Sequence, residues 1–335
     1  MYLDTVKGLA IFLVVFGHCI QYFNGSEFLT SGAFFDDTMF RVIYSFHMPL
    51  FALVSGYLFY SSASRRTPLE AVMKQARGLL LPALSWMVLY RLLAFCVKTM
   101  RGDFPGLEYL TSGLISGFIY GLWFLWAMFW CSLAVVIAEK FFHGRTSFYV
   151  FLAVVSLFVP DKLNTALHSF VYPYFAAGYI WHREGFDTKI NVFPSWLKIS
   201  GSIAVIAAWL VMLSFFDRSS YIYTTGVKIV QYREGIFTPL QLLTDIFRWA
   251  IGFAGSISVM IVMKLVKPLK ILQLIGAKTI GIYIMSGYVF GRIRPEHGGY
   301  IINFIEAVII TAICYALTAT ISKSRTLNTF LLGGR

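Results

Sequence analysis

Charged residues are scarce in this chain. They make up 13% of its 335 residues, whereas 58% are hydrophobic and the mean hydropathy is +0.71. No polar stretch is long enough for a separate soluble domain, and apolar runs of about twenty residues, the length that crosses a bilayer, recur from end to end. We therefore expect residues 1–335 to form a single integral-membrane domain, an all-α polytopic bundle of transmembrane helices.

Cysteine is rare as well, and several catalytic motifs are missing. Cys19, Cys96, Cys131 and Cys314 fall in or beside apolar runs without metal-type spacing, so we expect buried free thiols and no metal site. The chain has no GxSxG elbow, Walker loop or paired-carboxylate site. Nothing therefore indicates metal, nucleotide-hydrolysis or glycosidase chemistry.

Acidic residues are too few to balance the basic ones. The 28 Lys and Arg against 16 Asp and Glu give a net charge of +12. Because the basic residues are spread over loops between apolar runs, the positive-inside rule explains them better than nucleic-acid binding does. The strongest cluster, Arg65, Arg66, Lys74 and Arg77, lies in the loop 61–78. We expect this loop in the cytoplasm because of its positive charge, and the N-terminus on the same side. The predicted number of spans is even, which places the C-terminus there as well.

The hydrophobic pattern predicts about ten spans. They are Leu3–Phe23, Met39–Tyr60, Leu79–Val97, Gly113–Ile137, Ser147–Pro160, His168–Trp181, Trp196–Phe216, Leu242–Met263, Leu274–Gly291 and Ile301–Ile321. The fourth is longer than one span needs, so a short re-entrant or interfacial piece is expected before it. The longest polar connection, 217–239, carries Tyr221, Tyr223, Tyr232 and Arg233, and an interfacial tyrosine belt explains it more simply than a sugar-binding loop.

Three ionisable residues interrupt the first apolar run. Lys7 and His18 are eleven residues apart, which is close to three helical turns and roughly 16 Å of rise, so they share one helix face at different depths. Asp4 precedes Lys7 by three residues and can pair with its ammonium group. A charge in a bilayer is costly unless it faces a protein interior or a wet cavity, so this face should point to a site. Alternatively, Lys7 could snorkel to the membrane surface, and His18 could hydrogen-bond to a neighbouring helix.

Other candidates lie in later spans. His47 precedes Pro49, which removes a backbone donor and should kink or interrupt the second span. Arg41, earlier in that span, fits a membrane-surface position as well as a site. Glu306 is a carboxylate about one turn inside the last span. An intramembrane imidazole can take a proton from an attacking hydroxyl, and the pair Lys74 and Arg77 can hold phosphates. The residues therefore indicate general-base chemistry on an anionic cytosolic cofactor.

Several ordered blocks carry a family resemblance. They are Asp4-x-x-Lys7-Gly8 with Gly17-His18, Ser45-Phe-His47-Met-Pro49 with Ser55-Gly56-Tyr57, Lys74-x-x-Arg77 before Leu80-Leu81-Pro82, Leu122-Trp123-Phe124-Leu125, Tyr174-Phe175-Ala-Ala-Gly178-Tyr179 and Ile275-Gly276 through Tyr283. Together they resemble the acyltransferase 3 family of integral-membrane acyltransferases, particularly its short, fucose 4-O-acetylase-like members. Two positions depart from that family. Lys74 replaces the more usual arginine, and Met285-Ser286-Gly287 stands where the late block often continues to a histidine.

The resemblance implies O-acyl transfer, usually of acetyl, from cytosolic acetyl-CoA to a hydroxyl of a cell-envelope polysaccharide or its lipid-linked precursor. It implies that His18 is the catalytic base with Lys7 as its motif partner, and that Lys74 and Arg77 lie near the CoA phosphates. We add Asp4, which can pair with Lys7, to the catalytic candidates, and Arg65 and Arg66 of the same basic loop to the candidates for the CoA phosphates. Arg41, His47, Trp123 and Glu306 are the candidates for binding the substrate. The expected location is the inner (cytoplasmic) membrane, and a homodimer is left open.

Two other classes of protein fit the same pattern. A bundle with buried Lys, Arg, Asp and His could be a transporter or flippase of a glycolipid or small anion. It could also be a scaffold in a glycan-assembly complex. The alignment of Lys7 with His18 and the lack of an inverted repeat favour the enzyme. CoA release that depends on the acceptor would distinguish the enzyme from the transporter.

Overall fold

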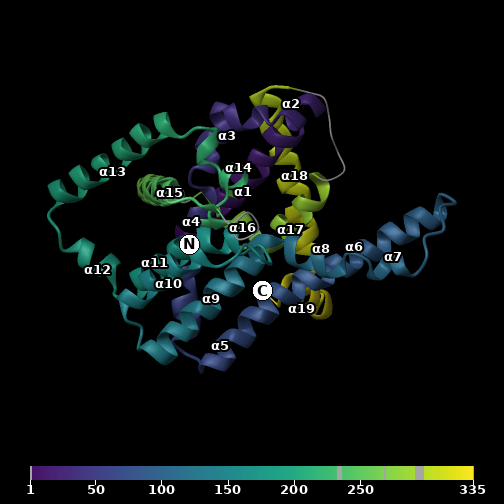
Figure 1. Cartoon of the computed structure of the whole chain (residues 1–335), viewed down its shortest axis with the longest axis horizontal. Coiled ribbons are helices and arrows are strands. Elements are labelled where there is room, and N and C mark those ends of the chain that lie inside the picture. Colours follow the sequence, from purple (N-terminus) through teal and green to yellow (C-terminus); the bar gives the residue numbers. More distant parts are fainter. Residues whose placement is uncertain (1, 232–235, 268, 291–297, 335) are drawn as a thin grey trace.

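The computed structural model describes residues 2–231, 236–267, 269–290 and 298–334, and its architecture is a bundle of α-helices (Figure 1). Within these residues seven helical segments are long and apolar enough to cross a membrane, which confirms an all-α polytopic membrane protein. They are α1 (Tyr2–Tyr22), α3 with α4 (Thr38–Tyr44, His47–Ala63), α5 and the π-helical turn η2 with α6 (Pro68–Gln75, Ala76–Leu80, Leu81–Met100), α9 (Trp123–Phe142), α13 (Ser195–Phe215), α15 (Leu240–Leu265) and α18 (Tyr300–Ile321).

The other elements are shorter or less apolar. They are α2 (Ser26–Ser31), η1 (Ala33–Asp36), α7 (Glu108–Thr111), α8 (Leu114–Tyr120), α10 (Thr146–Phe158), α11 (Thr165–Arg183), α12 (Phe186–Asn191), η3 (Arg218–Ser220), α14 (Ile222–Thr225), α16 (Lys270–Gly276), α17 (Thr279–Phe290) and α19 (Arg325–Leu332). The strands β1 (Val230–Gln231) and β2 (Ile236–Phe237) form one short antiparallel pair.

Each predicted hydrophobic segment coincides with a helix or with two consecutive helices. The segment 113–137 divides into α8 and α9, as its excess length predicts. The predicted break near Pro49 is also present, because α3 ends at Tyr44 and α4 begins at His47. Pro49 then lies in the first turn of α4, where a missing backbone N–H costs no hydrogen bond. The count of ten crossings and the predicted membrane side of the termini stay predictions.

Helix α1 lies at the centre of the bundle and packs against α4, α16, α17 and α18. A Cβ atom on Gly8 would lie 1.9 Å from the carbonyl oxygen of Leu272, so a glycine is required for this close approach of α1 to α16. In the same way, a Cβ atom on Gly56 would lie 1.9 Å from the carbonyl oxygen of Phe175, where α4 meets α11. Two tight helix pairs thus frame the middle of the molecule.

Two parts project from this centre (Figure 1). Helices α12 and α13 stand apart on one side, and α6 with α7 extends on the other. Helix α13 has no buried residue, and α6 buries residues of its first two turns alone. The expectation of four buried thiols is therefore wrong for Cys96, which is exposed on the outer part of α6, whereas Cys19, Cys131 and Cys314 are buried and free.

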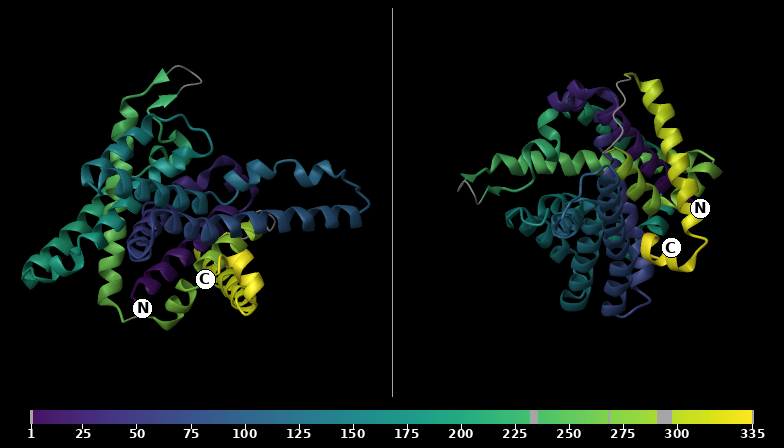
Figure 2. Two further views of the ribbon diagram at one scale, coloured as in Figure 1. Left: turned by 90° about the horizontal axis from the view of Figure 1, so that it is seen from below. Right: turned by 90° about the vertical axis from the view of Figure 1, so that its right-hand side faces the viewer.

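The two ends of the chain lie close together, as both views in Figure 2 show. Lys7, near the N-terminus, and Gly334, near the C-terminus, line the same cavity. The basic segment 61–78 reaches this cavity as well, through Ser62 in the last turn of α4 and Lys74 on α5. One end of the bundle therefore collects both termini and the predicted basic loop.

Candidate active site

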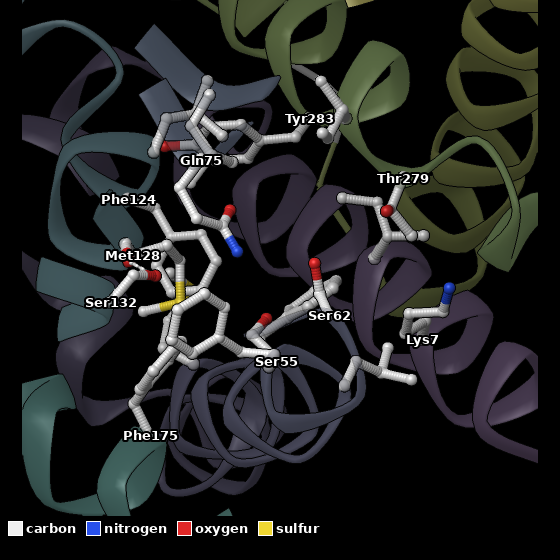
Figure 3. A pocket seen from close by; sticks show the side chains of 18 of the residues that line it. Lys7, Ser55, Ser62, Gln75, Phe124, Met128, Ser132, Phe175, Thr279 and Tyr283 are labelled. Carbon is white, nitrogen blue, oxygen red and sulfur yellow. Dashed lines mark hydrogen bonds between the residues drawn. The ribbon is translucent and has the colours of Figure 1, made fainter. Parts of the chain in front are cut away.

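A cavity of about 450 Å³ opens among α1, α4, α5, α9 and α17. Its size is typical of a small-molecule site, for which roughly 300–1,000 Å³ is usual. The walls are mostly apolar, with a few polar groups. Figure 3 shows the hydroxyls of Ser55 and Ser62 and the amide of Gln75 directed into the space. We refer to this space as the donor cavity.

The donor cavity is a long slot that follows α4. Its α4 lining runs from Ser62, at the end shared with Lys7 and Gly334, to Met48 near the start of the helix. The fourteen-residue step from Met48 to Ser62 corresponds to a helical rise of about 21 Å. Phe124 and Tyr283, whose ring centroids are 6.1 Å apart, wall the inner part with Phe51. The slot can accept a narrow, extended molecule whose charged end stays at the outer opening.

Lysines from two helices line this cavity. Lys7 pairs with Asp4, with 2.9 Å between Nζ and Oδ1, so the pairing predicted from their spacing is confirmed. The side chain of Lys7 is 22% exposed and lines the cavity. Lys74, on α5, is exposed and lines the same cavity. Two ammonium groups therefore give the opening a positive potential that suits an anionic ligand.

The face of α1 that lines the cavity leads to His18. Lys7, Ile11 and Val14 line it at spacings of four and three residues, and His18 follows one turn later on the same stripe. His18 itself lines neither this cavity nor the smaller one described below. Its ring lies 5.2 Å from that of Phe290 on α17, and its Nδ1 is 3.3 Å from the Oε1 of Gln21. His18 thus lies just beyond the inner end of the donor cavity.

A second, smaller space of about 30 Å³ adjoins that end, and we call it the inner chamber. Its walls include Tyr44, His47 and Met48 from the break between α3 and α4, together with Trp123 at the start of α9. His47 is buried, and its Nδ1 lies 2.8 Å from the carbonyl oxygen of Ile43. His47 is also close enough to His18 for the two to interact electrostatically. His47 therefore lines the chamber, and the imidazole of His18 lies in its neighbourhood.

A buried arginine holds one wall of the inner chamber. Arg248, on α15, is 2% exposed and pairs with Asp245, three residues earlier on the same helix, at 3.0 Å. Its guanidinium also donates to backbone carbonyls of the loop 217–226. The acceptors are Ser219, Ser220, Tyr221 and Gly226. Because Tyr221 and Tyr223 of this loop line the chamber, Arg248 fixes the position of that wall. The belt interpretation does not account for Tyr221, which is buried inside the bundle.

The remaining sequence candidates lie apart from this axis. Arg65, Arg66 and Arg77 are exposed around the opening, and none of the three lines the donor cavity. Arg66 donates to the hydroxyl of Ser62, which does line it. Glu306 lies on α18 close to Cys19, away from both spaces. Tyr232 and Arg233 lie outside the described residues.

Arg41 lies on α3, where its charge reaches Tyr221 at the chamber wall. Its Nε atom is buried and has no hydrogen-bond partner among the described residues. A buried donor of this kind is available to a ligand that enters the chamber from the loop side.

Sequence reasoning missed most of the residues that shape the two spaces. Ser55, Gln75, Thr279 and Tyr283 line the donor cavity from three separate helices, α4, α5 and α17. Arg248, which holds the wall of the chamber, was also missed. Gln75 directly precedes the π-helical turn at 76–80. Such turns are frequent at functional sites, but they are recognised in the structure and not in the sequence.

The structure is thus a polytopic helical domain in which a slot with lysines at its opening leads toward two imidazoles, features that suit an anionic ligand and proton transfer. The family comparison agrees, because residues 2–323 match the model of the acyltransferase 3 family, described as an acyltransferase domain. The chain belongs to this family and is therefore a membrane acyltransferase.

Two relatives share the name nodulation protein NolL. The protein of Mesorhizobium japonicum is 26% identical over 305 residues, which cover 86% of this chain and 75% of that protein. The protein of Sinorhizobium fredii is 30% identical over 241 residues, which cover 68% of this chain and 60% of that protein. No solved structure matches the chain significantly.

Proposed function

We propose that the protein is an O-acetyltransferase of the inner (cytoplasmic) membrane. It moves acetyl from cytosolic acetyl-CoA to a hydroxyl of a cell-envelope polysaccharide or of its lipid-linked precursor. The observation that carries this proposal is one face of α1, which bears Lys7 at the donor cavity and His18 just beyond its inner end. The face links a binding site for an anion to a proton acceptor.

The donor cavity would take the pantetheine arm of acetyl-CoA. An extended arm suits a slot that follows α4 for about 21 Å, and the nucleotide would remain at the opening. There Lys7 and Lys74 line the cavity, while Arg65, Arg66 and Arg77 surround it on exposed segments. Arginine and lysine both bind phosphates, so these five cations suit the phosphates of CoA.

In the proposed reaction His18 acts as the general base. It takes the proton of the acceptor hydroxyl as the hydroxyl oxygen forms a bond to the thioester carbonyl carbon. The carbon–sulfur bond breaks, and the proton passes from His18 to the departing thiolate. The products are an O-acetyl ester and free CoA. Asp4 and Lys7 position the donor in this scheme, since Asp4 holds the ammonium of Lys7 at the cavity.

The acceptor hydroxyl would meet the thioester beside the inner chamber, whose small volume leaves the rest of the acceptor outside it. Trp123, Tyr221 and Tyr223 give this chamber aromatic faces, and His47 and Arg41 supply polar groups beside them. Glu306 lies outside the chamber, so any contribution to binding the acceptor would come through α1, against which α18 packs.

The test of this proposal uses membranes that contain the wild-type protein. They are incubated with radiolabelled acetyl-CoA and an extract of lipid-linked glycans, and label is counted in the glycan fraction. We expect alkali-labile label in the glycans and CoA release that requires the extract. Label that enters no glycan, with CoA release independent of the extract, would overturn the proposal.

A further inference from the structure

The donor cavity and the inner chamber share one residue. Among the described lining residues Met48 alone belongs to both. Its side chain is 9% exposed, so it fills the boundary between the two spaces. The next boundary residues are Trp123, which lines the chamber, and Phe124, which lines the cavity. The partition is thus one flexible thioether side chain beside two large, stiff rings.

The position of Met48 in the chain adds to this relationship. It follows His47 directly, in the first turn of α4, and that turn starts at the break after α3. Met48 therefore lies between the slot that would hold a thioester and the imidazoles on its far side. A methionine can change rotamer at little cost because it is unbranched and has three rotatable side-chain bonds.

We propose that Met48 sets the length of the acyl group that the enzyme transfers. This inference rests on the proposed function and adds to it the donor specificity. The acyl group of the donor lies against Met48, and the space there admits acetyl but not longer chains. When Met48 turns aside, the thioester carbonyl meets the acceptor hydroxyl that His18 deprotonates. The oxygen bonds to the carbonyl carbon, the carbon–sulfur bond breaks, and the proton leaves with CoA.

The structure explains why the length of the acyl group would be limited at Met48 and not elsewhere in the slot. The opposite end of the cavity is open, so the size of the part of the donor that lies there is not restricted. At Met48 the next free space is about 30 Å³, too small for several methylene groups. Met128 on α9 also lines the donor cavity but not the chamber, so it offers a matched control (Figure 3). Both methionines are buried, and replacing either one by alanine removes the same atoms.

The experiment measures transfer from acetyl-, propionyl- and butyryl-CoA to the glycan extract by wild-type, Met48→Ala, Met48→Phe and Met128→Ala proteins. We expect Met48→Ala to raise the ratio of butyryl to acetyl transfer by about tenfold or more, the usual effect of methylene-sized changes in a pocket. Met48→Phe should lower the ratio of propionyl to acetyl transfer. Met128→Ala should keep the wild-type ratios.

The outcomes separate this inference from the proposed function. If the wild type transfers acetyl and Met48→Ala keeps its ratios, the role of Met48 is overturned and the acetyltransferase stands. Equal changes in the transfer ratios of Met48→Ala and Met128→Ala would also overturn it, because Met48 would then affect acyl length no more than another residue that lines the cavity. If the wild type transfers no acyl group at all, both proposals fall. Should Met48→Ala not fold, Met48→Val and Met48→Phe provide the same comparison.

Discussion

Lys7 and Lys74, from the first and the fifth helix of the chain, line the same cavity. Replacing either by methionine should raise the KM for acetyl-CoA by about ten- to a hundredfold, because a hydrogen bond to a charged group contributes roughly 1.5–3 kcal/mol. The KM for the acceptor should stay unchanged. Steady-state kinetics in membranes at low salt would measure both.

Lys198→Met is the matched control for those two changes. It removes the same charge from α13, which has no buried residue and contributes no residue to the lining of the cavity. A KM for acetyl-CoA that is the same in all four proteins would contradict the placement of the CoA phosphates.

Arg248 is expected to be the main support of the loop 217–226. Arg248→Leu should destabilise the protein by about 3–5 kcal/mol, because it leaves the carboxylate of Asp245 buried without its partner. Combining it with Asp245→Leu should restore part of that loss. Thermal unfolding in detergent would measure both effects, and a double variant no more stable than Arg248→Leu would show that the buried charge is not the cause.

Arg248 is also expected to affect the KM for the acceptor. Arg248→Lys keeps a positive charge beside Asp245 but cannot reach the several loop carbonyls that the guanidinium contacts. The KM for the acceptor should therefore rise while the KM for acetyl-CoA is unchanged. An equal rise in both would mean that the loop does not form the acceptor side of the site.

The buried position of Lys228 should make the free energy of unfolding depend on pH. Its Nζ donates to the carbonyl oxygen of Ser156 at 2.7 Å and to the hydroxyl of Ser169 at 2.8 Å, and burial lowers its pKa from 10.5 to about 8. Between these two values the unfolded chain binds more protons than the folded one. Stability should therefore rise as the pH increases from about 8 to 10.5, by an amount on the order of 1–3 kcal/mol.

The measurement compares thermal unfolding of the wild type and of Lys228→Met across that range. The difference between the two proteins should change with pH, whereas Lys162→Met, at an exposed position nearby, should follow the wild type. A difference that stays constant from pH 8 to 10 would show that Lys228 keeps an ordinary pKa in the folded protein.

The helices and the organising face of α1 could be predicted from the sequence. Hydrophobic runs are long, and the three-turn spacing of Lys7 and His18 is a local property of one helix. The ion pair between Asp4 and Lys7 follows from the same local geometry. The break before His47 follows from Pro49, since a proline is tolerated in the first turn of a helix and not in its interior.

The walls of the two spaces could not be predicted in this way. Met48, Phe124 and Tyr283 line one cavity because the fold brings α4, α9 and α17 around it, and no local pattern encodes which helix faces will enclose a space. The burial of Arg248 against loop carbonyls is likewise a tertiary contact between segments more than twenty residues apart. Cys96 was misplaced for a related reason, because hydrophobicity alone does not separate a lipid-facing position from one inside the bundle.

The central claim is that His18 is the base of an acetyl transfer, and one comparison tests it most directly. His18→Ala and wild-type membranes receive radiolabelled acetyl-CoA and the glycan extract, with His143→Asn as control. His143 is exposed and has a φ of 53°, a conformation that asparagine tolerates. We expect His18→Ala to lose about 100- to 10,000-fold in turnover, with the KM for acetyl-CoA unchanged. Full transfer by a correctly folded His18→Ala protein would contradict the account.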